Sequence, residues 1–253
     1  MAQNRPFNAK PTAAIWLFGR HPVEAAIANG KREIFSIYTT NENFDDIKEL
    51  CLQAKRNDKL IKVVTRQEIE KQLPAGAVHQ GIAAQVKPLE TYSIEDICTL
   101  AEERENCHIL ILDQVTDPQN IGAIIRSCVA FDTLALIVQD KNSPLESGTM
   151  AKASAGMIEL LPIVRCTNLA RAAEQLKKAG FWIFGMDGYA KTLIEKMNKD
   201  GKTAIVMGSE GKGMRRLTEE ICDDTIRLPI SEKVESLNVS TAAAIALYEI
   251  NKR

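Results

Sequence analysis

The stretch from Arg227 to Glu249 reads RLPISEKVESLNVSTAAAIALYE. It begins at the end of a short apolar strand, continues as a polar loop, and ends in an alanine-rich segment. We expect Ser240 or Thr241 to cap that segment as a helix, because hydroxyl oxygens accept hydrogen bonds from the free N–H groups of a first turn. From Ala242 to Tyr248 the helix is apolar almost all round, so most of its surface must be buried. The stretch therefore predicts a strand, a hydrogen-bonding loop and a packed helix.

The chain from His108 onward alternates short apolar runs with helical stretches. The clearest helical stretch is Asn168–Lys178, whose apolar residues share one face and which Gly180 ends. Apolar runs separated by helices are typical of a parallel sheet that carries helices on both faces. The expected strands are His108–Leu112, Leu134–Val138, Leu161–Val164, Phe181–Met186, Thr203–Met207 and Thr225–Leu228.

The residues before His108 predict a separate, smaller α/β unit. Four apolar runs there are separated by helical patterns, and the first follows a polar segment with two prolines. We therefore expect a flexible tail over 1–13, a small domain over 14–88, a linker with one helix over 89–107, and the larger domain over 108–253. The expected strands of the small domain are Trp16–Gly19, Glu33–Tyr38, Ile61–Val64 and Gly81–Val86.

Composition excludes several classes of protein. The chain has 253 residues and a net charge of -1, so any binding of nucleic acid must rest on a local basic patch. No apolar run approaches the length of a membrane span, and the N-terminus lacks the apolar core of a signal peptide. The 6 cysteines form no C-x-x-C pair and the 3 histidines lack metal-ligand spacing. We expect a cytoplasmic protein with reduced cysteines and no metal site.

Three loops follow predicted strands at the edge where open α/β sheets bind ligands. The first loop runs from Asp113 to Arg126 and enters a helix near Asn120, which leaves backbone N–H groups free for an anion. Arg126 lies roughly one and two-thirds turns after Asn120 in an otherwise apolar helix, where an unpaired charge would be costly. It either pairs with a carboxylate for structural reasons or binds a phosphate or nucleotide, for which the guanidinium fork is suited.

The second loop, Gly208–Met214, reads GSEGKGM. Its glycines allow a close approach between the backbone and a ligand. It does not fit the Walker A pattern, because Gly213 stands where that pattern has serine or threonine. No G-x-G-x-x-G follows the first strand either, which disfavours a standard dinucleotide-binding fold. The third loop is the polar part of the opening stretch.

Taken together, the three loops resemble the SpoU-type (TrmH-like) branch of the SPOUT methyltransferases. The resemblance rests on D-P-x-N-x-G-x-x-x-R over 117–126, G-S-E-G over 208–211, and L-P-I at 228–230 with S-L-N-V-S at 236–240. The front unit resembles the small L30e-like substrate-binding domain of some members, through FGRHPVEA over 18–25 and HQGIAA over 79–84. Both signatures together are most similar to members that methylate a guanosine ribose in large-subunit (23S) ribosomal RNA.

The resemblance implies a trefoil knot in the C-terminal domain, a rare exception to the rule against threaded chains. It implies that S-adenosylmethionine binds in the knot, with Gly208, Leu228 and Leu237 as cofactor residues and Ile230 lining the adenine slot. An apolar slit beside a glycine turn suits adenine, which needs flat walls and backbone hydrogen bonds. The implied catalytic residues are Asn120, Arg126, Glu210, Ser236 and Asn238.

Methylation of a ribose requires a deprotonated 2′-hydroxyl in line with the sulfonium methyl group. In the family, the arginine at the position of Arg126 is proposed as the base. A guanidinium with a pKa above about 12 is almost never neutral at pH 7. Arg126 can instead hold the phosphate on the 3′ side and stabilise the alkoxide electrostatically. Both roles predict that Arg126→Ala loses turnover far more than cofactor affinity.

The RNA partner requires basic residues on the surface. Candidates in the front unit and beside the second loop are Arg20, Lys31, Arg32, Lys212 and Arg215. Phosphate contacts of this kind make binding strongly dependent on salt. The resemblance also implies a homodimer, with which the small residues of the C-terminal helix are compatible.

Two other functions remain open. One is a transfer-RNA ribose methyltransferase, which the front domain disfavours because tRNA-specific relatives commonly lack it. The other is a non-catalytic RNA-binding assembly factor on the same fold, which the complete set of candidate catalytic residues disfavours. Methyl transfer to ribosomal RNA compared with transfer RNA separates these functions.

Overall fold

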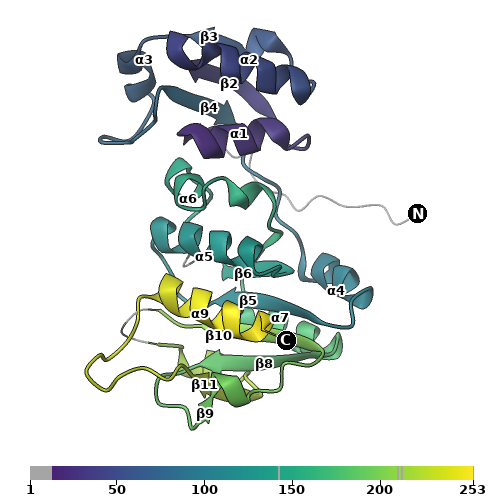
Figure 1. Cartoon of the computed structure of the whole chain (residues 1–253). Helices are drawn as coiled ribbons and strands as arrows, with labels where there is room; N and C mark the ends of the chain where they lie inside the picture. The colour runs from purple at the N-terminus through teal and green to yellow at the C-terminus, as the bar shows by residue number, and fades with distance from the viewer. Residues whose placement is uncertain (1–12, 142, 210, 212, 253) are drawn as a thin grey trace. The chain divides into compact units, whose positions relative to one another are not determined.

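The computed structural model describes residues 13–141, 143–209, 211 and 213–252. These residues form two compact units, each with its own sheet (Figure 1). The first unit runs to Glu90 and also takes in Glu146–Lys152, and the second holds Thr91–Leu145 and the chain from Ala153 onward. Nearly all of the expected tail over 1–13 lies outside the described residues.

The first unit is built on a mixed four-stranded sheet in the order β1-β4-β2-β3. β4 pairs antiparallel with β1 and β2, whereas β2 and β3 are parallel. Each expected strand is found within a few residues of its predicted bounds, and β1, β2 and β4 contribute buried apolar residues to a small core. The elements are β1 (Ile15–Phe18), α1 (Arg20–Ala28), β2 (Ile34–Thr39), α2 (Phe44–Gln53), β3 (Ile61–Val63), α3 (Arg66–Glu70) and β4 (Ile82–Val86).

A segment distant in sequence completes this unit at Arg32. The Arg32 side chain is 1% exposed, and its Nη2 lies 2.6 Å from Oε1 of Glu146. The backbone N–H of Leu89 donates to the other oxygen of Glu146 at 2.7 Å. Two residues on, a Cβ at Gly148 would lie 2.3 Å from the carbonyl oxygen of Trp16, so the segment packs closely against β1. Close packing and a buried ion pair explain why Glu146–Lys152 groups with the first unit.

The second unit contains a seven-stranded sheet in the order β7-β6-β5-β10-β8-β11-β9. Every pair of neighbouring strands in it is parallel, which confirms the predicted parallel sheet. All six residues of β5, at the centre, are buried, as expected for a strand covered on both faces. The strands are β5 (Cys107–Leu112), β6 (Ala135–Gln139), β7 (Ile163–Cys166), β8 (Phe181–Met186), β9 (Thr192–Leu193), β10 (Lys202–Met207) and β11 (Asp224–Arg227).

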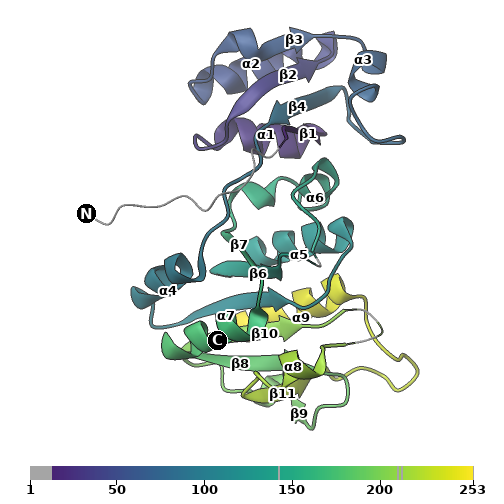
Figure 2. The same cartoon turned by 180° about the vertical axis from the view of Figure 1, so that it is seen from behind.

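Helices cover both faces of this sheet (Figures 1 and 2). On one face, α4 (Ile94–Glu102) and α7 (Leu169–Lys178) bury apolar residues with the strands in one continuous core. The helix expected in the linker over 89–107 is thus part of this core. On the other face, α5 (Pro118–Ala130) packs against α9 (Val239–Asn251). Among the described residues, no helix is long and apolar enough to span a membrane.

The cap of α9 differs from the prediction. Asn238 is the N-cap, and its Oδ1 accepts hydrogen bonds from the backbone N–H of Ser240 at 2.9 Å and from the Ser240 hydroxyl at 2.6 Å. The prediction of Ser240 or Thr241 as the cap is therefore wrong by two residues or more. Asparagine caps as well as serine does, so the sequence alone left several adjacent polar residues able to serve.

Candidate active site at the carboxyl edge of the sheet

The three candidate loops leave the same edge of the seven-stranded sheet. The first follows β5, the second follows β10 and the third follows β11, and these strands are parallel members of one sheet. β5 and β10 are neighbours, and β8 lies between β10 and β11. Ligands of open α/β sheets bind at this carboxyl edge, where loops from different strands meet.

The first and third loops are joined by one side-chain hydrogen bond. Nδ2 of Asn238 donates to Oδ1 of Asn120 at 3.0 Å. Asn120 lies in the first turn of α5, which starts at Pro118 behind an Asp117 cap, slightly earlier than expected. Asn238 stands at the start of α9, so the amino ends of two packed helices meet at this bond. The bond places these two candidate catalytic residues side by side.

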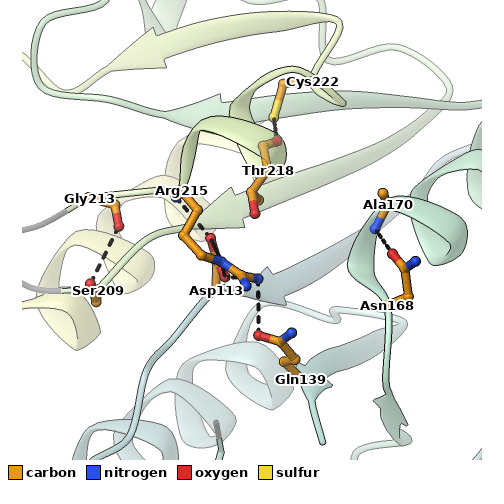
Figure 3. Close-up of polar contacts among 9 residues, drawn as sticks. All are labelled: Asp113, Gln139, Asn168, Ala170, Ser209, Gly213, Arg215, Thr218 and Cys222. Atoms are coloured by element: carbon orange, nitrogen blue, oxygen red, sulfur yellow. Dashed lines mark hydrogen bonds and ion pairs between the residues drawn. The ribbon is translucent and has the colours of Figure 1, made fainter. Parts of the chain in front are cut away.

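The first and second loops are joined at Asp113, which is fully buried immediately after β5. Its backbone N–H donates to the carbonyl of Met207 at 2.8 Å. Its carboxylate accepts the backbone N–H of Arg215 at 3.0 Å and forms an ion pair with the Arg215 guanidinium at 2.7 Å. Nη2 of Arg215 also donates to Oε1 of Gln139, at the end of β6 (Figure 3). Asp113 and Gln139 were absent from the predicted site, although an aspartate directly after a wholly apolar strand marks such a position.

Two residues of the glycine turn between Met207 and Arg215 are hydrogen-bonded to each other. The backbone groups of Ser209 and Gly213 exchange two hydrogen bonds, at 3.1 and 2.9 Å. A Cβ at Gly208 would lie 2.2 Å from the carbonyl carbon of Gly213, so no side chain fits there. Gly211 and Gly213 have φ of 79° and 65°, which favour glycine. Two predicted site residues, Glu210 in the catalytic set and Lys212 in the RNA-binding set, lie outside the described residues.

Arg126 is exposed on α5. The helical turn directs it away from Ile124 and Ile125, which are fully buried. In this chain taken alone, the cost expected for an unpaired charge in an apolar helix is therefore small, because the side chain is solvated. Within the described residues, no hydrogen bond or ion pair engages the Arg126 guanidinium, so the structural pairing with a carboxylate is not found there.

The third loop presents a mixture of apolar and polar groups. Leu228, directly after β11, is 9% exposed, whereas Ile230 is 37% exposed. Leu237 is half-buried and Ser236 is exposed. The predicted cofactor residues of this loop thus include a buried side chain, Leu228, and the exposed Ile230 predicted to line the adenine slot. No cluster of three or more His, Cys, Asp or Glu that could hold a metal occurs in the part of the chain that the structure describes.

Some of the predicted RNA-binding side chains are exposed, whereas others already bind other residues of this chain. Lys31 is exposed, and Arg20 is exposed but pairs with Glu24 at 2.6 Å and Asp46 at 3.0 Å. Arg32 is 2% exposed, so its prediction as an RNA contact is not retained. The reason is that a buried carboxylate holds its guanidinium inside the first unit.

Arg215 is the second arginine whose guanidinium binds other residues of the chain. Its side chain is 40% exposed, but its donors point to Asp113 and Gln139. The prediction counted Arg215 as a free surface charge because a sequence does not show which acid a base meets. We therefore assign Arg215 to the polar contacts at the exit of the glycine turn.

Comparisons with known proteins agree with this arrangement. The model of the SpoU rRNA Methylase family matches residues 108–248. The chain belongs to this family. A second family model, for RNA 2′-O ribose methyltransferase substrate binding, matches residues 16–92. The family assignment thus covers the large sheet, and the second match covers the small one.

Individual relatives cover nearly the whole chain. The chain is 39% identical to the 23S rRNA (guanosine-2′-O-)-methyltransferase RlmB of Photobacterium profundum, over 92% of this chain and 95% of that protein. It is 37% identical to the RlmB protein of Escherichia coli over 92% and 96% of the two chains. Among solved structures, the SpoU methyltransferase AviRb from Streptomyces viridochromogenes, in complex with AdoMet, matches with a TM-score of 0.78. That match is 21% identical, covers 95% of this chain and 90% of that chain, and so supports the fold.

Proposed function

We propose that this SpoU family member transfers the methyl group of S-adenosylmethionine to the 2′-hydroxyl of a guanosine ribose in 23S ribosomal RNA. The single observation that carries the proposal is the hydrogen bond between Asn120 and Asn238. It joins the first and third loops at the edge where α/β sheets bind ligands. The RlmB relatives, similar across both units, supply the substrate class.

The cofactor is proposed to bind against Gly208, Leu228, Ile230 and Leu237. The fit rests on the tight turn at Gly208, where the backbone of Gly213 and Met214 leaves no room for a side chain, and on the buried wall of Leu228. Adenine is held by such apolar walls and backbone groups. When bound, S-adenosylmethionine supplies an electrophilic methyl group on a sulfonium.

The remaining site residues are proposed to position the ribose. Asn120, Ser236 and Asn238 can accept and donate hydrogen bonds to it, and the proposal includes Glu210. Arg126 is exposed and unpaired within the described residues, which suits a group that meets the phosphate of an incoming RNA. Its guanidinium then stabilises the negative charge on the 2′-oxygen as the hydroxyl gives its proton to solvent water. Holding this oxygen in line with the methyl group lowers the entropic part of the barrier.

The RNA is proposed to contact the first unit through exposed basic side chains such as Arg20 and Lys31. The match of residues 16–92 to a substrate-binding family model supports this placement. It also favours ribosomal RNA over transfer RNA as the substrate, because both RlmB relatives share the front unit. A ribosomal RNA substrate would place the protein in the cytoplasm. Binding through phosphates should weaken steeply as salt rises.

A homodimer is part of the proposal. Thr241, Ile245 and Tyr248 are exposed on α9, and their spacing puts them on one helix face. Exposed apolar side chains on a helix of small residues suit contact with a second copy of this chain. The trefoil knot of the C-terminal domain remains a prediction from the resemblance.

The test is methyl transfer from labelled S-adenosylmethionine to 23S ribosomal RNA and to transfer RNA, each transcribed without modifications. We expect label in the ribosomal RNA, at a 2′-O-methylguanosine identified by mass spectrometry after nuclease digestion. Label confined to transfer RNA would support the transfer-RNA alternative. Binding of the cofactor without label in either RNA would support a non-catalytic assembly factor.

A further inference from the structure

The glycine turn that follows β10 is held at both ends by one buried residue, Asp113, which directly follows β5. At its entrance, the N–H of Asp113 donates to the carbonyl of Met207 at 2.8 Å. At its exit, Oδ2 of Asp113 accepts the N–H of Arg215 at 3.0 Å. The turn therefore begins and ends on Asp113, which is 0% exposed.

The Arg215 side chain strengthens the contact at the exit. Its Nε donates to Oδ1 of Asp113 at 2.9 Å, and its Nη2 lies 2.7 Å from the same oxygen. The Nη2 group also donates to Gln139 at 3.0 Å, so the ends of β5 and β6 and the exit of the turn meet at one guanidinium (Figure 3). Charge-assisted bonds of this geometry are stronger and more directional than neutral ones.

Arg215 also begins the next element. Its carbonyl accepts the N–H groups of Thr218 and Glu219 at 2.8 and 2.9 Å, so α8 (Arg216–Glu219) starts from it. Its side chain makes no cap hydrogen bond to that helix and is used for Asp113 instead. The main chain of Arg215 is thus held on both sides.

We propose that Asp113, through Arg215, is a positioning residue that holds the glycine turn in the shape that receives the methyl donor. The inference rests on the proposed function, since it assigns the turn at Gly208 to the cofactor. Neither residue touches the donor. Each acts through the backbone of the turn, which is anchored at both ends and in which Ser209 pairs with Gly213. A turn held before binding loses less conformational freedom when the ligand arrives.

The experiment measures S-adenosylmethionine affinity by calorimetry, the KM for the donor, kcat and the KM for RNA, on the full chain. Arg215→Ala is expected to raise both the Kd and the KM for the donor at least tenfold. The value of kcat at saturating donor should change less than threefold. Arg215→Lys should recover part of the affinity, because an ammonium still reaches Asp113 but cannot form the fork. Arg216→Ala, at the exposed neighbouring position, is the matched control and should leave donor affinity unchanged.

Hydrogen exchange provides a measurement that does not depend on the donor. In Arg215→Lys, which keeps a positive charge beside the buried carboxylate, amides of the turn should exchange faster than in the wild type. If wild-type protein binds no S-adenosylmethionine, the proposed function fails, while exchange still tests the positioning role. Unchanged exchange and donor affinity within twofold of the wild type would overturn the inference. A rise confined to the KM for RNA would also overturn it, and would return Arg215 to the RNA-binding set.

Discussion

The side-chain amide of Asn238 donates a hydrogen bond to the side-chain oxygen of Asn120, 118 positions earlier in the chain. The side-chain oxygen of the same Asn238 accepts the backbone N–H of Ser240 and so caps α9. One side chain therefore serves two purposes, since it starts the last helix and ties that helix to the start of α5. The site proposed here depends on that double use.

Variants of Asn238 separate the cap from the link. Asn238→Ser keeps a good capping oxygen but is too short to reach Asn120, so the free energy of unfolding should change by less than about 1 kcal/mol. Asn238→Ala loses both contacts and should cost about 1–2 kcal/mol. Urea unfolding measures these differences. Both variants and Asn120→Ala should lose methyl transfer, and full transfer by Asn238→Ser would contradict a functional role for the link.

Arg126→Ala should lose turnover with little change in cofactor binding or stability. The side chain is exposed and has no partner within the described residues, so removing it should change the free energy of unfolding by no more than about 0.5 kcal/mol. Turnover should fall at least a hundredfold, as is typical when an electrostatic stabiliser is removed. Single-turnover kinetics and calorimetry with S-adenosylmethionine measure the two effects. Equal losses in both would place Arg126 in the cofactor site.

Gly208→Ala should abolish high-affinity cofactor binding. The new methyl group would lie 2.2 Å from the carbonyl carbon of Gly213, so the backbone of the turn must shift. Gly180→Ala is the control for the cost of a side chain at a glycine, because a Cβ there meets nothing within 4 Å, although its positive φ adds strain. Calorimetry should show weak donor binding for the first variant and normal binding for the second.

Glu146→Ala should strongly destabilise the first unit. The side chain of its partner Arg32 is 1% exposed, so the variant removes a carboxylate from beside a buried guanidinium and should cost more than the loss of an exposed pair. The control is Glu33→Ala, which removes an exposed pair with Lys87 and should cost about 1 kcal/mol or less. Urea unfolding of both variants provides the comparison. For the same reason, a fragment that ends at Glu90 should be less stable than the unit in the full chain.

Buried thiols should make stability fall at high pH. Burial raises the pKa of Cys128 and of Cys222 to about 12, and that of Cys166 to about 11. An unfolded cysteine has a pKa of about 8.5, so the folded state keeps protons that the unfolded state loses. The stabilisation is full below that pH and is lost as the pH rises toward the folded pKa, by about 1 kcal/mol per thiol between pH 8.5 and pH 9.5. In urea unfolding, Cys128→Ala should lose less free energy of unfolding than the wild type over this pH range.

Much of the fold could be predicted because it depends on local patterns. Uninterrupted apolar runs such as Cys107–Leu112 are buried on both faces wherever they lie, so they predict central strands of a parallel sheet. The helical spacing of apolar residues likewise predicted α7, whose buried residues share one face. The helix cap at Asn238 was missed because several adjacent polar residues are chemically able to cap.

The candidate site was predictable in its loops but not in its side-chain partners. The order of strands and loops places Asn120, Gly208 and Asn238 at strand ends, which is enough to expect them at one edge. Arg32 and Arg215 were assigned to RNA because a basic residue in a sequence carries no information about the carboxylate it will meet. Asp113 was left out of the predicted site because its role depends on both ends of another loop.

The sequence by itself determined the strands, the helices, the parallel sheet and the identity of the loops at its edge, because these follow from periodicity and residue type along the chain. Only the tertiary structure decided which charges are available. Folding brought Glu146 to Arg32 and Asp113 to Arg215, so the guanidinium donors of these two arginines are used within the fold. Contacts between residues so distant in sequence are set by the packing of whole elements, which no local pattern encodes.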